Sequence, residues 1–543
     1  MSLRDSNIDR LSGATFDVLI VGAGINGAVA AAVLASRGAS VCLVDRGDFA
    51  GFTSEESSNL VWGGFKYLEN YEFGLVRHLC RSRNRLIRAY PSNIKEIRFL
   101  AALDESAPYS PWFAAAGAAA YWAIGNGATR PPRHLSPERI ADEEPTIDVS
   151  RVRGGIEYSD AYLVDNDARF VFGFVRSALN VGATAANYVE VVSAERGADT
   201  WHCHLRDVDT GADHEVAARV LVNATGPFVD GFNEGLGVRT RHRIVCSKGI
   251  HLIVPRIGRQ ERVLAFFDDT GRLFYVIPMG MRSVIGTTDT RVESALTEVT
   301  AEDRDFLLEQ IDKRLALPEP LTAADVISTR CGVRPLVVDA AAGVSEDTEW
   351  TSLSRKHAIE VDAEAKAITV FGGKLTDCLN VGRELYDLVG GLGIPLDAYK
   401  RDWYGEPPAA TRAEYLRQTR LMRLDRLRRS PGFEPLTTRL WRRYGLRAFA
   451  MLEALRDDPS MADDVIEGAQ YIRAELHLAA TTEMVTRFED FLRRRSKISQ
   501  VMRHDEIEGA EGLTEAADIL FGADAGRRVD EYFSAHSGPD AIA

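Results

Sequence analysis

Long apolar runs are scarce in this sequence. The run from Phe16 to Ala35 is broken by Gly22, Gly24 and Gly27, and the run from Phe113 to Ile124 is short. A helix needs about 20 apolar residues to span a bilayer, and neither run supplies them without a break. The sequence therefore predicts no transmembrane segment, and it leaves open whether 113–124 is a buried helix or an interfacial one.

Cysteine is scarce as well. The six cysteines form no C-x-x-C pair, which favours free thiols in a reducing compartment. His202, Cys203 and His204 could suggest a metal site. However, Trp201 to Leu205 alternates like a strand, and no second ligand cluster lies nearby, so we expect a strand and no metal.

Positive charge is in deficit. Lys and Arg number 65 against 79 Asp and Glu, so the net charge is −14. A nucleic-acid partner, which requires a basic face, is therefore not expected, although a local basic pocket for an acidic substrate is compatible with this balance. The segment before Phe16 is polar and lacks a secretory signal, so we expect a cytoplasmic protein.

The 543 residues, 45% apolar and 27% charged, are enough for two or three globular domains. A strand at 16–21, a helix at 26–37 and a strand at 40–44 open the chain in the order of an α/β fold. Beyond residue 400, Arg and Leu recur at helical spacing, which predicts a separate helical domain. Further helices are expected at 71–89, 166–181 and from about 375, and strands at 185–206, 216–223, 240–290 and 355–371.

The first strand–helix junction carries a dinucleotide-binding fingerprint. Gly22 permits the tight turn, Gly24 lets the backbone approach a pyrophosphate, and Gly27 lets the helix pack on the strand. The start of the helix then faces the pyrophosphate with free N–H groups. Asp45, at the end of the second strand, is placed to accept hydrogen bonds from ribose hydroxyls.

Two later junctions favour FAD over NAD. Residues 221–227 and 370–376 each read as a strand that ends in a glycine turn. A long planar cofactor needs several such backbone approaches along the chain. The second junction also puts a helix N-terminus where it can stabilise negative charge on a reduced flavin.

These segments resemble the FAD-dependent glycerol-3-phosphate dehydrogenases, and the resemblance runs in order over nearly the whole chain. The carrying segments are Val-Gly-Ala-Gly-Ile-Asn-Gly (21–27), Gly-Gly-Phe-Lys-Tyr-Leu-Glu (63–69), Asn-Ala-Thr-Gly-Pro (223–227), Lys-Gly-Ile-His-Leu-Ile-Val-Pro (248–255), Ile-Gly-Thr-Thr-Asp (285–289), Gly-Val-Arg-Pro-Leu (332–336), Phe-Gly-Gly-Lys-Leu-Thr (371–376), Ala-Glu-Leu-His (474–477) and Phe-Leu-Arg-Arg-Arg (491–495).

The resemblance implies an enzyme that oxidises sn-glycerol 3-phosphate to dihydroxyacetone phosphate by hydride transfer to flavin N5. It also implies that the electrons pass to quinone or to oxygen, and that the protein is a peripheral membrane homodimer at the inner face of the cytoplasmic membrane. The fold it implies is a glutathione-reductase-like FAD-binding Rossmann domain with a mixed α+β substrate domain and a C-terminal all-α domain. On this basis we divide the chain into FAD-binding parts at 1–90, 151–240 and 346–395, substrate-domain parts at 91–150 and 241–345, and a helical domain at 396–543.

The resemblance also assigns roles to residues. His251 matches an active-site histidine suited to act as a base, and Arg334 matches an arginine near the flavin that would stabilise charge. Lys66, Arg355 and Lys374 would pair with a substrate phosphate. The residues assigned to the cofactor are Gly22, Gly24, Ile25, Asn26, Gly27, Asp45, Arg46, Thr53, Ser54, Ser57, Ser58, Gly63, Val189, Ala224, Gly226, Gly332, Arg334, Gly373, Lys374, Leu375 and Thr376.

The loop at 57–69 departs from the family pattern Ser-Ser-Lys-Leu-Ile-His-Gly-Gly-Leu-Arg-Tyr-Leu-Glu. Asn59 replaces a lysine, Trp62 a histidine and Lys66 an arginine. The substrate could therefore be another hydroxy acid, amine or polyol. A flavin-binding subunit with little activity is a third hypothesis, which the retained His251, Arg334 and Lys374 disfavour.

A membrane contact has one local indication. The apolar stretch at 111–124 is accompanied by a basic helix that carries Arg81, Arg83, Arg85 and Arg88. This combination fits a surface that meets a bilayer, and it fits an interior helix beside a solvated basic one equally well.

Overall fold

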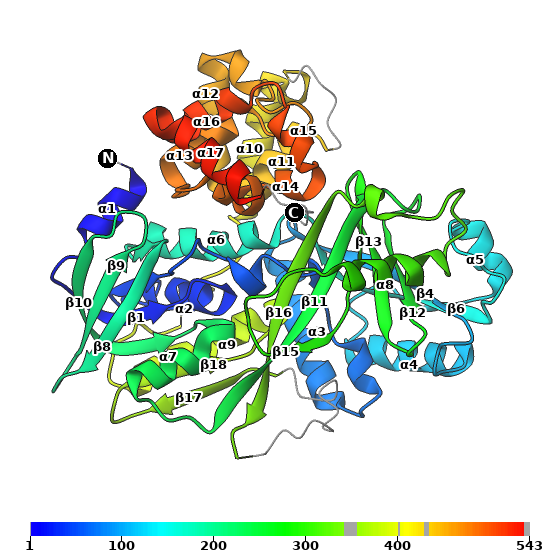
Figure 1. Ribbon diagram of the computed structural model, residues 1–543, viewed down its shortest axis with the longest axis horizontal. Coiled ribbons are helices and arrows are strands. Elements are labelled where there is room, and N and C mark those ends of the chain that lie inside the picture. The colour runs from blue at the N-terminus through cyan, green and yellow to red at the C-terminus, as the bar shows by residue number, and fades with distance from the viewer. Residues whose placement is uncertain (1, 342–355, 400–401, 428–433, 537–543) are drawn as a thin grey trace.

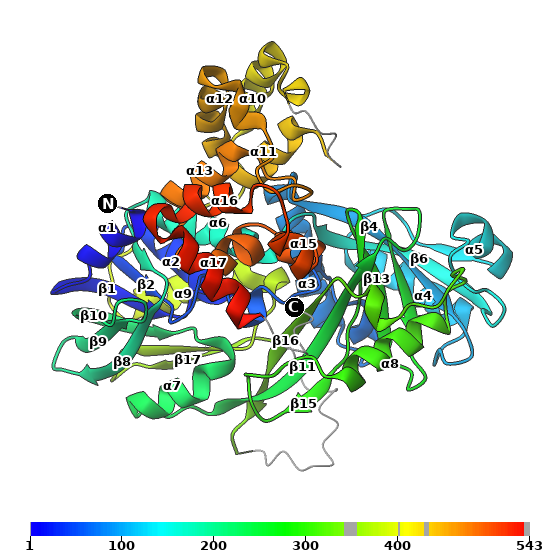
Figure 2. The same cartoon turned by 45° about the horizontal axis from the view of Figure 1, so that its top comes forward.

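The structure is a computed structural model that describes residues 2–341, 356–399, 402–427 and 434–536. Two β-sheets lie side by side, and a domain of helices sits over both of them (Figure 1). The view turned by 45° shows the same helical domain standing clear of the sheets at its far end (Figure 2).

The first sheet holds the predicted nucleotide-binding unit. Strand β1 (Ala14–Val21) pairs in parallel with β2 (Val41–Val44) and with β10 (Asp213–Asn223). Val18, Leu19 and Ile20 are fully buried, as expected for a parallel strand covered on both faces. The remaining strands of this sheet are β7 (Thr184–Ala186), β8 (Val189–Arg196), β9 (Trp201–Asp207), β17 (Ala358–Asp362) and β18 (Ala367–Phe371).

Helices cover both sides of this sheet. Helix α2 (Ile25–Ala35) packs against α6 (Asp167–Asn180) and α9 (Cys378–Gly391), and their side chains share one apolar core with β1 and β2. On the other side lie α1 (Leu3–Asp9) and α7 (Val229–Leu236), with the hairpin of β8 and β9. The predicted helices at 26–37 and 166–181 are thus confirmed.

The strands predicted over 185–206 are confirmed, because β7, β8 and β9 occupy this range. Tyr188 takes a left-handed φ of 55° between β7 and β8, and residues 197–200 turn the chain between β8 and β9. The strand expected at 201–205 is confirmed as β9, where His202 and His204 alternate with the buried Cys203.

The second sheet is mixed. Its order is β15-β11-β14-β13-β12-β4-β6-β3, with β16 added beside β11 and β5 beside β6. Strand β6 belongs to this sheet although the sequence divides the chain at 150/151, because β6 pairs with β4 along its whole length. The strands are β3 (Leu60–Val61), β4 (Ile94–Leu103), β5 (Arg133–Leu135), β6 (Gly154–Leu163), β11 (His242–Pro255), β12 (Arg262–Phe267), β13 (Leu273–Met279), β14 (Arg282–Gly286), β15 (Thr290–Val292) and β16 (Ser328–Asp339).

Four helices flank the second sheet: α3 (Phe73–Ala89), α4 (Pro111–Ile124), α5 (Pro137–Glu143) and α8 (Ala301–Asp312). The inner face of α4 buries Ala114, Ala118 and Tyr121, while its outer face leaves Trp112 74% and Phe113 64% exposed. Helix α4 therefore has one buried and one solvent-facing apolar side. Within the described residues, no helix combines the length and apolarity needed to cross a bilayer.

The predicted helical domain is confirmed beyond residue 400. Its apolar side chains form two cores of their own, separate from those of the sheets. The helices are α10 (Ala409–Met422), α11 (Leu436–Tyr444), α12 (Ala448–Asp457), α13 (Arg473–Thr482), α14 (Ile498–Val501), α15 (His504–Glu508), α16 (Leu513–Phe521) and α17 (Ala525–Ala535).

Buried ion pairs join this helical domain to the first sheet. Asp48 is 3% exposed and accepts hydrogen bonds from Arg494 at 2.9 Å and from Arg495 at 2.7 and 2.9 Å. Burial alone would raise the pKa of Asp48, but Arg495 and Arg494 outweigh it and the pKa lies below its usual value. The carboxylate is therefore ionised where the two domains meet.

Asp48→Asn is expected to lower the free energy of unfolding by about 3 kcal/mol, because two buried guanidinium groups lose their counter-charge. Urea unfolding followed by tryptophan fluorescence measures the change. Asp387→Asn removes the partner of Arg383 from an exposed helical pair and is the matched control, with an expected change below about 0.5 kcal/mol. Equal stabilities for the two variants would contradict the role given to Asp48.

Candidate cofactor and active site

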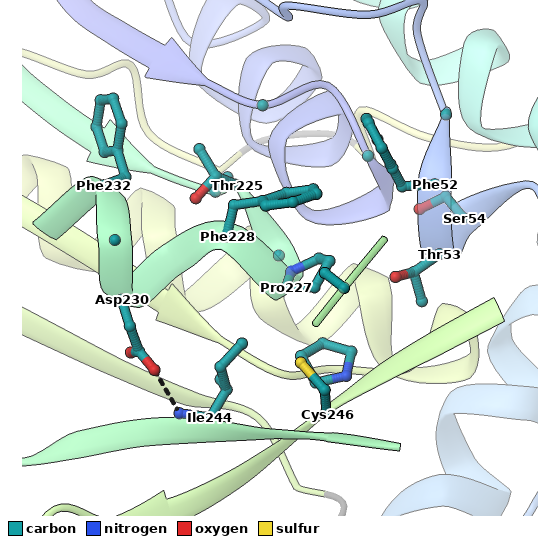
Figure 3. Close-up of a pocket in the computed structure, with 18 of the residues that line it drawn as sticks. Phe52, Thr53, Ser54, Thr225, Pro227, Phe228, Asp230, Phe232, Ile244 and Cys246 are labelled. Atoms are coloured by element: carbon teal, nitrogen blue, oxygen red, sulfur yellow. Dashed lines mark hydrogen bonds between the residues drawn. The ribbon is translucent and has the colours of Figure 1, made fainter. Parts of the chain in front are cut away.

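A pocket of about 890 Å³ opens at the carboxyl ends of β1 and β2. Figure 3 shows three walls: the loop of Phe52, Thr53 and Ser54, the turn that carries Thr225, Pro227 and Phe228, and strand β11 with Ile244 and Cys246. The Asp230 carboxylate accepts the backbone N–H of Ile244 at 2.9 Å and so ties α7 to β11 (Figure 3). The pocket thus lies between the two sheets.

Glycines bring backbone close to this pocket where a side chain would collide. Gly22 has a φ of +96°, and a Cβ there would lie 2.6 Å from the carbonyl oxygen of Ala224. A Cβ on Gly27 would lie 1.8 Å from the carbonyl oxygen of Gly22, so α2 can approach β1 only without one. Gly24 caps α2 without a side chain, and Ile25 donates its N–H to Ser54 Oγ at 3.0 Å. Gly24, Ile25 and Asn26 line the pocket, so the N-terminal end of the helix faces it, and this end suits an anion such as a pyrophosphate.

Asp45 lies in the same pocket at the end of β2. Its carboxylate accepts the N–H of Ala23 at 2.6 Å and of Gly47 at 2.8 Å, one on each oxygen. Burial raises the pKa of Asp45, and these two hydrogen bonds oppose the shift. Each oxygen keeps a further lone pair for a ribose hydroxyl.

Two aromatic rings and a cation line the pocket nearby. Phe52 and Phe228 meet edge to face with centroids 5.0 Å apart, and the Arg46 guanidinium lies 4.3 Å from the Phe228 ring. Arg46 was predicted from the sequence to contact the cofactor, whereas Phe52 and Phe228 were not. Sequence reasoning also missed Ile244, Cys246 and the segment 291–296, because they reach the pocket from the second sheet and carry no local glycine signal.

Twelve of the residues assigned to the cofactor line this pocket. They are Gly22, Gly24, Ile25, Asn26, Asp45, Arg46, Thr53, Ser54, Val189, Ala224, Gly226 and Gly373. Gly27 lies behind them, against Gly22. Segments that are far apart in the sequence therefore meet around one cavity, as the fingerprint and the later glycine turns predict.

Other assigned residues lie elsewhere. Gly63 is buried against the second sheet, where its N–H donates to Asp160 and a Cβ would collide with the Tyr121 hydroxyl. Gly332 lets β16 approach Glu56, and Ser57 donates its N–H to Asp167. Ser58 is half-buried in the same loop, Leu375 begins the turn before α9, and Thr376 is buried within that turn.

His251 lies on β11 in the interior of the protein. Its ring is 3% exposed, and both ring nitrogens lack a hydrogen-bond partner among the described residues. Burial, and then the charges of Arg330 and Arg334, hold the pKa of His251 well below its usual 6.5. The ring is therefore neutral at pH 7 and has an unshared nitrogen that can accept a proton.

Arg334 extends from β16 across β11. A Cβ on Gly249 would lie 2.1 Å from an Arg334 nitrogen, so the absence of a side chain there makes room for the guanidinium. Arg334 donates to Thr287 Oγ1 at 2.7 Å and to the carbonyl oxygen of Thr288 at 3.3 Å. Because Gly249 and His251 occupy alternate positions on the same strand face, Arg334 and His251 share one face of the sheet.

Lys374 contacts an aromatic pair from the divergent loop. Its ammonium bonds the Tyr67 hydroxyl and lies 4.1 Å from the Tyr67 ring centroid and 6.0 Å from that of Trp62. Trp62 and Tyr67 themselves pack with centroids 5.6 Å apart. Lys66, which lies between Trp62 and Tyr67 in the sequence, is half-buried. Arg355 lies outside the described residues.

Arg330 is a further cation that sequence reasoning missed. It lies directly opposite His251 in the pairing of β11 with β16 and is 1% exposed. Its Nη1 donates to Asn59 Oδ1 at 2.7 Å, so these two buried side chains are hydrogen-bond partners.

The chain is similar to known proteins along most of its length. Residues 17–355 match the family described as FAD dependent oxidoreductase, and residues 419–528 match the C-terminal domain of alpha-glycerophosphate oxidase. A glycerol-3-phosphate dehydrogenase 2 of Mycobacterium bovis is 32% identical over 97% of this chain and 88% of its own length. The aerobic glycerol-3-phosphate dehydrogenase of Escherichia coli is 30% identical over 91% of this chain and 96% of its own.

Solved structures share the fold. The glycerol-3-phosphate dehydrogenase of Bacillus halodurans, complexed with FAD, has a TM-score of 0.70 at 23% identity and covers 98% of this chain and 93% of its own. The L-alpha-glycerophosphate oxidase of Mycoplasma pneumoniae has a TM-score of 0.55 at 16% identity over 72% of this chain and 98% of its own. The predicted α/β FAD-binding fold, with its mixed substrate sheet and helical C-terminal domain, is confirmed.

The residues of the pocket fit FAD, the cofactor of this family. The glycine turn at 22–27 would allow backbone contact with a pyrophosphate, and the Asp45 carboxylate would accept hydrogen bonds from the adenosine ribose. The far wall of the pocket reaches Gly373, at the strand end before Lys374.

Gly27→Ala is expected to reduce bound FAD to less than about a tenth of the wild-type content, because the new Cβ would separate α2 from β1 and displace the pyrophosphate turn. The visible flavin absorbance per mole of protein gives the content. Gly173→Ala is the matched control, since Gly173 is also helical and nothing lies within 4 Å of its Cβ position. Full FAD content in the Gly27 variant would rule out this packing argument.

Proposed function

Because the chain belongs to the family of FAD-dependent glycerol-3-phosphate dehydrogenases, we propose that it oxidises sn-glycerol 3-phosphate to dihydroxyacetone phosphate and passes the electrons to a quinone. The observation that carries the substrate proposal is a buried, neutral histidine beside Arg330 and Arg334 on β11, the strand whose first part lines the cofactor pocket. A neutral base suits an alcohol, and the cations suit its phosphate.

His251 is the proton acceptor in this proposal. An alcohol becomes a ketone when its carbon loses a hydride and its oxygen loses a proton, and FAD, when bound, supplies the hydride acceptor. His251 would take the hydroxyl proton on an unpartnered ring nitrogen. The low pKa of the ring keeps this nitrogen available at neutral pH.

The cations divide into two roles. Arg334 stays protonated, and its position on the face of β11 beside His251 suits stabilisation of negative charge on the reacting oxygen. Lys374 and Lys66 lie at the divergent loop and would hold the phosphate, with Arg355 as a further partner that the family resemblance suggests.

The quinone part of the proposal rests on a surface of the second sheet, defined here as the α3–α4 surface. Tyr71 and Phe73 are 78% and 50% exposed beside the outer face of α4, where Trp112 and Phe113 are exposed. Toward the other end of these two helices, where Asn126 and Ala128 follow α4, Arg81, Arg85 and Arg88 line a cavity of about 520 Å³. Exposed aromatic rings and arginines carried by the same two helices suit the interface of an anionic bilayer, in which quinones dissolve.

A second candidate function follows from the divergent loop. Trp62 and Tyr67 place aromatic surface around Lys374, where the family pattern has a histidine in place of Trp62. A tryptophan is larger and more apolar than a histidine, so less space is left around Lys374 than in the family pattern. This suits a different hydroxy acid, amine or polyol on the same scaffold.

Glycerol 3-phosphate at millimolar concentration is expected to bleach the flavin under anaerobic conditions. His251→Ala is expected to slow this reduction by about 100-fold or more, the contribution of a lost general base. The wild-type rate is expected to stay flat from about pH 7 to 8 and to fall only below pH 6.5, because protonation of His251 removes the base. Stopped-flow absorbance measures both rates.

A flavin that stays oxidised with glycerol 3-phosphate but is bleached by another alcohol or amine would favour the second candidate. His202→Ala, an exposed histidine on β9, is the control for the His251 variant and should reduce at the wild-type rate. A wild-type rate in His251→Ala would exclude the proposed base.

The double variant Trp112→Ser, Phe113→Ser is expected to weaken binding to vesicles that contain anionic phospholipid by about tenfold or more, because two exposed aromatic anchors are lost. Co-sedimentation with the vesicles measures binding. Leu421→Ser, which changes a 72% exposed side chain on α10, is the control. Unchanged binding by the double variant would exclude the α3–α4 surface as the bilayer contact.

A further inference from the structure

Arg330 joins three parts of the chain next to His251. Its Nη1 donates to the carbonyl oxygen of Ser57 and to Asn59 Oδ1, in the loop of the first half of the chain. Its Nη2 donates to Gln500 Oε1 at 2.5 Å, on α14 of the helical domain. The Asp167 carboxylate of α6 lies 3.7 Å from Nη1.

Gln500 is as deeply buried as Arg330. Its side chain is fully inaccessible, and its backbone carbonyl accepts a hydrogen bond from Ser328 Oγ at 2.8 Å. Ser328 and Arg330 both belong to β16. Gln500 is therefore bonded to this strand twice, through its backbone carbonyl to Ser328 and through its side chain to Arg330. The helical domain thus reaches the strand that pairs with His251.

Several polar atoms around this point lack partners within the described residues. They are both ring nitrogens of His251, Nε of Arg330 and Nε2 of Gln500. A buried polar atom without a partner costs about 1 to 3 kcal/mol, so natural proteins rarely keep several of them together outside functional sites. The group is therefore suited to receive a polar ligand.

We propose that Arg330 is a positioning residue of the active site, held in place by Gln500, and that the helical domain thereby takes part in the reaction. The catalytic meaning of this proposal rests on the role of His251 under the proposed function. Arg330 acts through His251 and the loop at 57–59, whose carbonyl and amide oxygens it binds.

The charges around His251 explain what Arg330 does there. Strand β16 brings Arg330 and Arg334 toward the ring, whereas β14 brings Gly286, whose missing side chain leaves room for it. Asp167 pairs with Arg330, and Asp289 lies 3.5 Å from Arg334. On the helical-domain side, burial lowers the pKa of Lys497 to about 8, and Arg330 contributes to that shift.

Position 59 supports the same assignment. The family pattern has a lysine there, and this chain has Asn59, whose side-chain oxygen accepts from Arg330. Arg330 therefore supplies a positive charge from strand β16, next to a loop position that carries no charge in this chain.

The test is a titration of His251 in the FAD-loaded protein without substrate, by NMR of histidines labelled at Cε1, with His251→Gln to assign the signal. In the wild type the ring should stay neutral down to pH 6.5. Arg330→Gln should raise the midpoint by about one pH unit, because one neighbouring cation is removed. Arg330→Lys keeps the charge and should leave the midpoint near the wild-type value.

Gln500→Leu tests the link to the helical domain. It keeps both arginines, so the titration should stay near the wild type, while anaerobic flavin reduction should slow by about tenfold or more as Arg330 and His251 lose their fixed geometry. Gln418→Leu, in the same domain, is the matched control: its side chain donates to Glu414 on its own helix, so the change should leave the rate unchanged.

An unshifted His251 titration in Arg330→Gln, or Gln500→Leu reducing as fast as Gln418→Leu, would overturn the proposal. If Arg330→Gln does not fold, Arg330→Lys decides the electrostatic part: a raised midpoint there would count against it. If glycerol 3-phosphate does not reduce the wild-type flavin, the proposed function fails, whereas the titration still decides the role of Arg330.

Discussion

The backbone pairing of β11 with β16 is the constraint on which the site depends. It runs without a break from His242 opposite Asp339 to Ile253 opposite Ser328. The first part of β11 forms a wall of the cofactor pocket, and the later part carries His251. Because side chains alternate along a strand, this one register puts His251, Arg330 and Arg334 on a common face. A slip by one residue would turn all of them away.

The other elements place charged side chains and main-chain atoms next to the paired strands β11 and β16. The glycine turn at 22–27 and the turn at 224–226 bring main-chain atoms to the pocket from the first sheet. The loop at 57–59 crosses to Arg330, and α14 closes over it from the helical domain. The buried Arg330 thus lies where the two sheets and the helical domain meet, and its partners come from the loop at 57–59, from α6 and from α14.

Much of the fold could be predicted from the sequence because its signals are local. The order of strand, glycine turn and helix at 16–37 is written in consecutive residues, and so is the change to helical spacing beyond residue 400. Twelve of the pocket-lining residues were assigned from the sequence, and those in the turns around Gly22, Gly24, Gly226 and Gly373 have a glycine signal of their own. The break between β7 and β8 was not predicted, because Tyr188 gives no warning of a left-handed conformation.

The rest of the site depends on contacts between distant segments. Arg330 looks like any arginine in a strand, and only its neighbours at 57–59, 167 and 500 give it significance. Ile244 and Cys246 likewise reach the cofactor pocket from a strand assigned to the substrate domain. The position of His251 came from family resemblance, whereas the burial and unpartnered nitrogens of its ring emerge only in three dimensions.

The buried ion pairs of Asp48 with Arg494 and Arg495 limit which C-terminal domains can be joined to this chain in a chimaera. The acidic half of this contact lies near the start of the chain, and the basic half lies near its end. A chimaera that took its C-terminal part from a protein without these arginines would keep Asp48 buried without its partners, and without Gln500 it would also change the neighbour of Arg330. Exchange of the helical domain therefore preserves these contacts only where the donor supplies both arginines and the glutamine.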